Sequence, residues 1–214
     1  MPLGRVVVAC ALALLAQITA PPALAADPQP VLTGTVTKVV DADTIDVQLT
    51  SGPIRIRLYG IDAPERSQPW GSEATEFLSG KILHQTVELE PFRQDRYERM
   101  IAIVHKGDVN VNTELVRLGH AWAFRKYLHR TDTDYCNFEA EARTAKRGLW
   151  SLPRTEHTGT EANTERQVTT PGGASTGDRF AIAPWEYRKR KSRQSFTDYS
   201  TATAKHCIAE LGKR

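Results

Sequence analysis

The sequence has little of several features that mark common classes of enzyme and binding protein. It carries 28 basic and 25 acidic side chains, a formal net charge of +3, so no strong overall positive field would attract an acidic partner. Its six histidines show no HExxH or similar spacing, and it has only three cysteines, which argues against a zinc site. It contains neither a P-loop nor a GxSxG motif. Any attraction to nucleic acid must come from local clusters of charge.

The N-terminus has the features of a secretory signal peptide. Arg5 supplies a positive charge, Val6 to Ile18 is almost entirely apolar, and Ala23 and Ala25 are small residues where a signal peptidase reads them. We therefore expect residues 1–25 to be removed and the protein to be secreted or periplasmic. The apolar run is short for a bilayer, so we expect no stable membrane anchor.

Two cysteines, Cys136 and Cys207, would remain in the exported chain. An oxidising compartment permits a disulfide, but a disulfide requires Cα atoms within roughly 7 Å. Sequence spacing does not reveal that distance, so their pairing stays open.

Alternating apolar and polar residues predict five short strands in two groups. The expected strands are residues 33–40, 44–49, 54–59, 86–90 (ended by Pro91) and 100–104. Helical spacing predicts helices at 72–84, with Ser72 as N-cap, at 112–118, with Gly119 after its last turn, and at 134–146. Without βαβ alternation, this order indicates an α+β, mainly β fold: a five-stranded barrel of the oligonucleotide/oligosaccharide-binding (OB) type with three helices.

Composition divides the rest of the chain. We expect the barrel domain to span residues 31–152 and a flexible linker to span 153–183, which is rich in Thr, Glu, Gly and Ser. Residues 184–214 form a basic C-terminal tail, in which a dense run of Lys and Arg at 188–193 follows Trp185 and Tyr187. This run could bind phosphates and stack a base, or it could be a solvated charged tail.

Three charged clusters fall at expected strand ends: Asp41–Thr44, Arg57–Glu65 and Asp95–Arg99. Loops at a barrel rim are frequent places for binding and catalytic residues. Asp43 and Asp62 would offer a cation only hard oxygen ligands, which suit Ca²⁺ or Mg²⁺. Asp41 to Asp46 is not an EF-hand loop, because Ile45 occupies a ligand position and the required glycine is missing.

Five ordered motifs resemble the staphylococcal (thermonuclease, or micrococcal) nuclease family: VVDADT, RLYGIDAPE, DRYERMIA, VNTELVRLGHAW and EAEARTAKRGLW. The resemblance covers about residues 33–152. It implies a nuclease that cleaves DNA and RNA with Ca²⁺ and leaves 3′-phosphates, and we expect a monomer. By position, it implies calcium ligation by Asp43, Asp62 and the Ala63 carbonyl, catalysis by Arg57, Glu65 and Arg99, and nucleotide contacts by Tyr97 and Tyr127.

The sequence also departs from the family pattern. Ala42 and Glu98 stand where the family usually has glycine, and Ala63 stands where it has threonine. Glu98 adds a negative charge beside Arg99, which could weaken phosphate binding or point to solvent. Arg125 falls near an aromatic position of the base-stacking site.

Two other functions are compatible with the same sequence. One is a barrel that binds nucleic acid without cleaving it, and the other is an envelope interaction protein that uses the basic tail. A non-catalytic copy would not need both arginines and the glutamate, all of which are present here. The retention of Arg57, Glu65 and Arg99 together therefore favours the nuclease.

Overall fold

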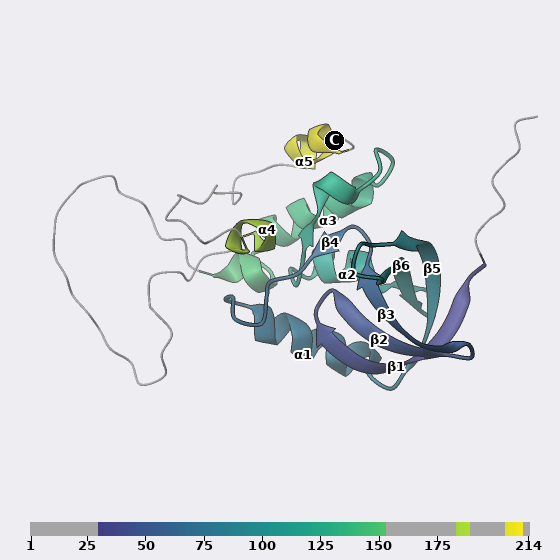
Figure 1. The fold of residues 1–214 in the computed structure, drawn as a ribbon. Helices are drawn as coiled ribbons and strands as arrows, with labels where there is room; N and C mark the ends of the chain where they lie inside the picture. Colours follow the sequence, from purple (N-terminus) through teal and green to yellow (C-terminus); the bar gives the residue numbers. More distant parts are fainter. Residues whose placement is uncertain (1–29, 153–182, 189–203, 212–214) are drawn as a thin grey trace, which may run out of the picture.

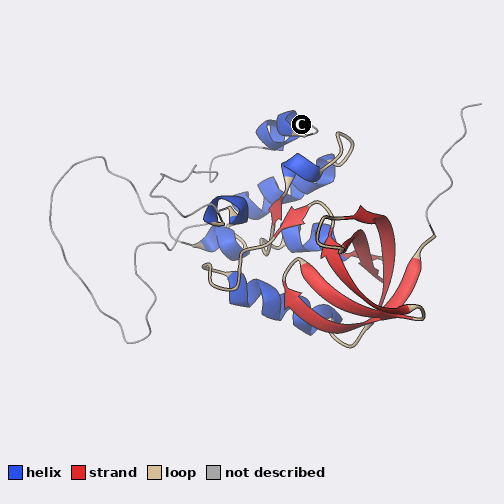
Figure 2. Cartoon of the chain, viewed as in Figure 1, coloured by secondary structure: helices blue, strands red, loops and turns tan. Residues whose placement is uncertain are grey.

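The computed structural model describes residues 30–152, 183–188 and 204–211. A curved sheet forms one side of the molecule and helices pack beside it (Figures 1 and 2). The strands are β1 (Leu32–Asp41), β2 (Thr44–Leu49), β3 (Gly52–Leu58), β4 (Ile61–Asp62), β5 (Thr86–Gln94), β6 (Met100–Lys106), β7 (Val109–Asn110) and β8 (Trp122–Ala123). The helices are α1 (Gly71–Ile82), α2 (Val111–Arg117), α3 (Thr133–Thr144), α4 (Pro184–Tyr187) and α5 (Ala204–Glu210), with 3₁₀ turns η1 (Arg125–Tyr127) and η2 (Gly148–Ser151).

The sheet closes into a barrel because strands β3 and β6 pair with each other. Its strand order is β3-β2-β1-β5-β6-β7, with antiparallel neighbours, and β3 also pairs in parallel with β6. This confirms the predicted mainly β fold with a five-stranded OB-type barrel. The three helices predicted for the barrel domain correspond to α1, α2 and α3, and the short α4 and α5 follow that domain in the sequence.

Side chains of the predicted inward faces fill the barrel. Ile45, Val47 and Leu49 of β2 are all buried, as are Ile56 and Leu58 of β3. Three residues of α1 contribute to the same core: Ala74, Leu78 and Ile82. The period-2 and helical patterns in the sequence therefore mark the surfaces that pack together.

A buried amide helps to hold the closing strands. Asn112 of α2 accepts a hydrogen bond from the Val104 backbone N–H at 3.0 Å. Its Nδ2 donates to the carbonyls of Tyr59 at 2.9 Å and Ala102 at 3.2 Å. Because these carbonyls lie at the end of β3 and on β6, Asn112 fixes the junction from which the candidate site extends.

Two local predictions were wrong. Pro91 does not end its strand: β5 continues to Gln94, with an irregularity between Pro91 and Arg93. The pairing of β5 with β1 stops at Leu89, so the missing N–H of Pro91 faces no partner strand there. Ser72 is not the N-cap of α1: Trp70 holds that position in a left-handed conformation (φ 72°), without a side-chain hydrogen bond.

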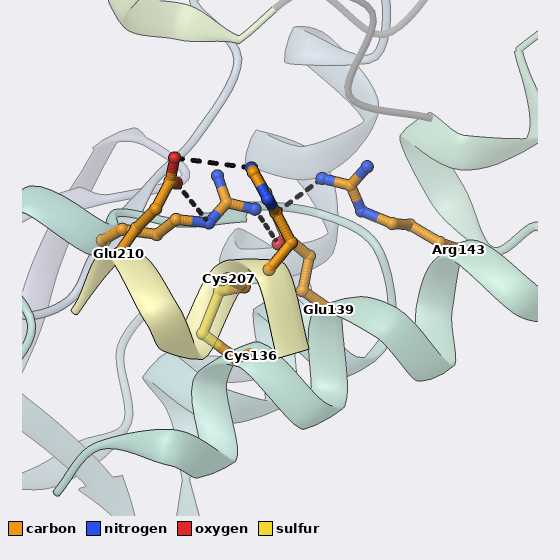
Figure 3. Close-up of a disulfide and its surroundings, with 7 residues drawn as sticks. Cys136, Glu139, Arg143, Cys207 and Glu210 are labelled. Atoms are coloured by element: carbon orange, nitrogen blue, oxygen red, sulfur yellow. Dashed lines mark hydrogen bonds and ion pairs between the residues drawn. A yellow bond between two sulfur atoms is a disulfide. The ribbon is translucent and has the colours of Figure 1, made fainter. Parts of the chain in front are cut away.

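The two cysteines pair. Cys136 of α3 and Cys207 of α5 form a disulfide with a Cα–Cα distance of 5.6 Å (Figure 3). Beside it, the buried Glu139 carboxylate accepts from Arg125 at 2.7 Å and lies 3.2 Å from Arg143. The disulfide and the ion pair between Arg125 Nε and Glu210 Oε2, at 3.6 Å, attach α5 to the body of the domain.

Most of the other predicted segments lie outside the residues that the structure describes. The expected signal peptide (residues 1–25) and nearly all of the expected linker (153–183) lie outside the described residues. Of the expected tail (184–214), the structure describes 184–188 and 204–211. None of the helices in the described ranges is long and apolar enough to cross a membrane.

Candidate active site

Strand register brings the charged clusters of the sequence to one end of the barrel. Arg57 on β3 lies opposite Thr44 on β2 and opposite Ile101 on β6. Thr44 immediately follows Asp43, and Ile101 comes two residues after Arg99. The parallel β3–β6 pairing therefore places the first and third clusters on either side of the second.

Two buried aspartates converge on the guanidinium of Arg57. Arg57 Nη1 contacts Asp43 Oδ1, and Nη2 lies 2.7 Å from Asp62 Oδ1. The side chain of Asp62 is fully buried and that of Asp43 is 6% exposed. Burial lowers the pKa of Arg57, while the charge of Asp62 and its hydrogen bond act in the opposite direction. This paired arrangement allows two carboxylates to be buried close together.

Backbone contacts bring Ala63 to the same place. The Ala63 N–H donates to Asp43 Oδ2 at 2.8 Å, and the Thr44 hydroxyl donates to Asp43 Oδ1 at 3.0 Å. The N-terminal half of the Asp62-Ala63-Pro64-Glu65 turn is thus fixed against the β1–β2 turn.

The donor set fits a hard divalent cation. Asp43, Asp62 and the Ala63 carbonyl would supply oxygen ligands only, as Ca²⁺ prefers, with water or substrate oxygens completing the coordination. In the described parts of the chain, no group of three or more His, Cys, Asp or Glu side chains is arranged to hold a metal.

Glu65 lies on a loop that is tightly packed against the start of α1. Its backbone N–H donates to Gln68 Oε1 at 2.8 Å, and its carbonyl accepts from the Gln68 N–H at 2.7 Å. A Cβ on Gly71 would lie 1.9 Å from the Glu65 carbonyl oxygen, so only glycine permits this approach. Gln68 and Gly71 therefore position Glu65, a role that no charge or periodicity in the sequence indicated.

A separate carboxylate holds Arg99. Asp95 Oδ2 accepts from Arg99 Nε at 2.8 Å, and Asp95 Oδ1 accepts from the backbone N–H groups of Tyr97 and Arg99. Burial raises the pKa of Asp95, but the hydrogen bonds from Arg99 and the two N–H groups outweigh it, and the net pKa is lowered. The charge of Arg99 also acts on the pKa of Arg57, so the two guanidiniums are electrostatic neighbours.

The structure explains the departure at position 98. Glu98 has a left-handed backbone (φ 62°), the conformation that glycine adopts most easily. Its side chain is exposed, and the guanidinium beside it pairs with Asp95. The added charge therefore points to solvent and does not occupy Arg99.

The two tyrosines implied by the resemblance are exposed, Tyr97 at 63% and Tyr127 at 45%. Arg99 lies 5.4 Å from the centre of the Tyr97 ring, which ties Tyr97 to the site. Tyr127 packs edge-on against Phe124, whose N–H donates to the Gly60 carbonyl. Arg125, by contrast, is buried in its ion pair with Glu139 and offers no stacking surface.

One residue of the site comes from the far end of the chain. Arg188, which follows α4, places Nη2 at 2.6 Å from Asp62 Oδ2 and Nη1 at 2.6 Å from Glu65 Oε1. The sequence showed it only as the first charge of the basic run, 123 residues beyond Glu65. No local pattern could have paired them.

Comparison with known proteins identifies relatives of the chain. A family model described as Staphylococcal nuclease homologue matches residues 55–152. An uncharacterized endonuclease of Escherichia coli O157:H7 is 41% identical over 131 residues, which cover 61% of this chain and 82% of the relative. The micrococcal nuclease of Shigella flexneri is 38% identical over 132 residues, or 58% and 76% of the two chains. With these motifs, this barrel and relatives matched over most of their length, the chain belongs to the staphylococcal nuclease family.

Proposed function

We propose that this protein is an exported, calcium-dependent nuclease that hydrolyses phosphodiester bonds of DNA and RNA and leaves 3′-phosphates. The observation that carries the proposal is the convergence of Asp43 and Asp62 on Arg57, with Glu65 three residues beyond Asp62. Family membership supports the reaction class. We further propose that it acts as a monomer and is secreted or periplasmic, in line with the expected signal peptide and with its disulfide.

The roles follow from the chemistry of phosphodiester cleavage. Asp43, Asp62 and the Ala63 carbonyl would hold Ca²⁺, and a bound divalent cation neutralises and polarises the phosphate. Arg57 and Arg99 present planar donor forks that match phosphate oxygens, and they would stabilise the charge that builds on them during attack.

Glu65 would act as the general base. Its carboxylate would take a proton from the attacking water as the oxygen bonds to phosphorus and the 5′ oxygen leaves. Its side chain is 36% exposed, compared with the fully buried Asp62, so water can reach it. The exposed rings of Tyr97 and Tyr127 would contact the nucleotide, since every base offers a face for stacking.

The test is cleavage of plasmid and single-stranded DNA and of RNA by the purified protein, with Ca²⁺ or with a calcium chelator. We expect cleavage only with Ca²⁺, and a loss of about 10²–10⁴ in rate for Glu65→Gln. Glu73→Gln is the matched control, because it makes the same substitution at an exposed glutamate on α1. It should cleave at the same rate as the parent.

Two results would refute the proposal. One is degradation that persists in the chelator, and the other is binding of nucleic acid by the parent protein without any cleavage. The second result would indicate a barrel that only binds nucleic acid.

A further inference from the structure

Arg188 occupies both carboxylates that the proposed reaction needs most. Its two terminal nitrogens each lie 2.6 Å from an oxygen, one of Asp62 and one of Glu65. Burial lowers the pKa of Arg188, but the Asp62 charge and hydrogen bonds to both carboxylates raise it by more. One guanidinium therefore bridges the expected metal ligand and the expected base.

A short segment of the chain positions the Arg188 guanidinium at the site. Residues 183–188, here called the strap, begin with the buried Ala183 and Pro184. The ring of Trp185 stacks on Phe124, with centroids 5.3 Å apart and an interplanar angle of 4°, and meets Trp122 edge-on at 5.6 Å. Trp122 on β8 is the register partner of Asp62 on β4. Trp122, which Trp185 contacts, and Asp62, which Arg188 contacts, therefore lie on paired strands.

The contacts of Asp62 make the consequence specific. Oδ1 contacts Arg57 and Oδ2 contacts Arg188, so a cation bound to Asp62 would lie beside two positively charged guanidiniums, and their repulsion favours the departure of one of them. The Arg57 side chain is 14% exposed and is also held by Asp43. The Arg188 side chain is 43% exposed, and its two carboxylate contacts lie at the end of the strap. Arg188 is thus the partner that can leave.

We propose that Arg188 competes with the divalent cation for Asp62 and Glu65, so that the strap sets the cation concentration at which the site becomes loaded. This inference rests on the proposed calcium-dependent function. While Arg188 is docked, it withholds a metal ligand and pairs with the general base, and cation binding requires it to move away. When only a fraction of the molecules is in the state that can bind the cation, the apparent Kd equals the intrinsic Kd divided by that fraction.

The disulfide keeps the strap close after release. Arg188 lies between Cys136 and Cys207 in the sequence, inside the loop that their bond closes. The chain before the strap follows η2 and the chain after it leads to α5, so the strap is tethered to the domain on both sides. Its return to the carboxylates is an intramolecular event at high effective concentration.

Calcium binding to the whole purified protein, measured by isothermal titration calorimetry, tests the competition directly and independently of activity. We expect Arg188→Ala to lower the Kd for Ca²⁺ about tenfold, the effect of a state in which roughly nine-tenths of the molecules have Arg188 docked. Arg188→Lys should give a Kd for Ca²⁺ between those of the parent and of Arg188→Ala. A lysine ammonium is a point charge and cannot bridge both carboxylates as the forked guanidinium does.

Two further variants separate the strap from a general charge effect. Trp185→Ala keeps the charge of Arg188 but removes its anchor, and it should also tighten Ca²⁺ binding. Arg55→Ala removes an equally forked arginine, 51% exposed, that pairs with Asp46 at 2.7 and 3.0 Å outside the site. It should retain the parent's Kd.

The outcomes distinguish the competition by Arg188 from the proposed calcium-dependent nuclease activity. If the parent binds Ca²⁺ and cleaves DNA while Arg188→Ala and Arg188→Lys keep the parent's Kd, the competition is refuted and the nuclease stands. If Arg188→Ala cleaves more slowly at unchanged calcium affinity, Arg188 contacts substrate phosphate and the competition is again refuted. If neither the parent nor any variant binds Ca²⁺, both proposals fall.

Discussion

The buried imidazole of His120 predicts that the protein loses stability as the pH falls through the mildly acidic range. Its ring stacks on Phe77 at 4.1 Å between centroids, and Nδ1 accepts a hydrogen bond from Trp70 Nε1 at 3.2 Å. Burial lowers the pKa of His120 from 6.5 to about 4, and the charge of Glu114 opposes this only in part. Protonation would place a charge in this apolar stack and remove the acceptor for Trp70.

The sign follows from proton linkage. Between pH 6.5 and pH 4 the unfolded chain binds a proton at this site and the folded chain does not, so protons favour the unfolded state. The loss of stability due to His120 is absent above about pH 6.5 and reaches its full size near pH 4. Because His120 is partly exposed, we expect a loss of about 2 kcal/mol in the free energy of unfolding between pH 7 and pH 4.5.

Urea unfolding of the parent and of His120→Gln at both pH values measures this effect. Glutamine does not titrate, so the variant should be less stable than the parent at pH 7 but should lose about 2 kcal/mol less on acidification. His129→Gln, which replaces an exposed histidine before α3, shows whether losing any histidine has the same result. Parallel pH dependence of the parent and His120→Gln would refute the reasoning.

Two more predictions concern the backbone and the disulfide. Glu98→Gly should raise the free energy of unfolding by about 0.5–1 kcal/mol, because it relieves the left-handed strain at φ 62° but gives the unfolded chain more freedom. Glu98→Ala keeps the Cβ, so equal stability of the two variants in urea would contradict the strain. Reducing the Cys136–Cys207 bond, whose cysteines are 71 residues apart, should lower the free energy of unfolding by up to about 4 kcal/mol. Coincident unfolding curves with and without reductant would argue against that contribution.

The sequence predicted the barrel well because local patterns determine most of it. The alternation in β2 and β3 marks the inward faces whichever strands they pair with, and those residues are buried as expected. The prediction failed where a neighbour decides the outcome. Pro91 can remain within β5 because the partner strand β1 has already ended, a fact of pairing that the residues around Pro91 do not contain.

In the candidate site, too, some residues could be recognised from the sequence and others could not. Asp43, Arg57 and Asp62 were recognisable from ordered motifs, and the register of β2, β3 and β6 brings their segments together. The part played by Glu98 was not recognisable, since its backbone angle and the pairing of Arg99 with Asp95 exist only in the folded loop.

By itself, the sequence determined the family, the barrel and the acidic and basic groups at its rim, because short-range periodicity and ordered motifs encode them. Only the tertiary structure decided what the C-terminal region contributes. The contact of Arg188 with Asp62 joins residues 126 positions apart, and the disulfide joins cysteines 71 apart. Such contacts depend on where packing places each segment, which the stacking of Trp185 on Phe124 fixes and no local pattern encodes.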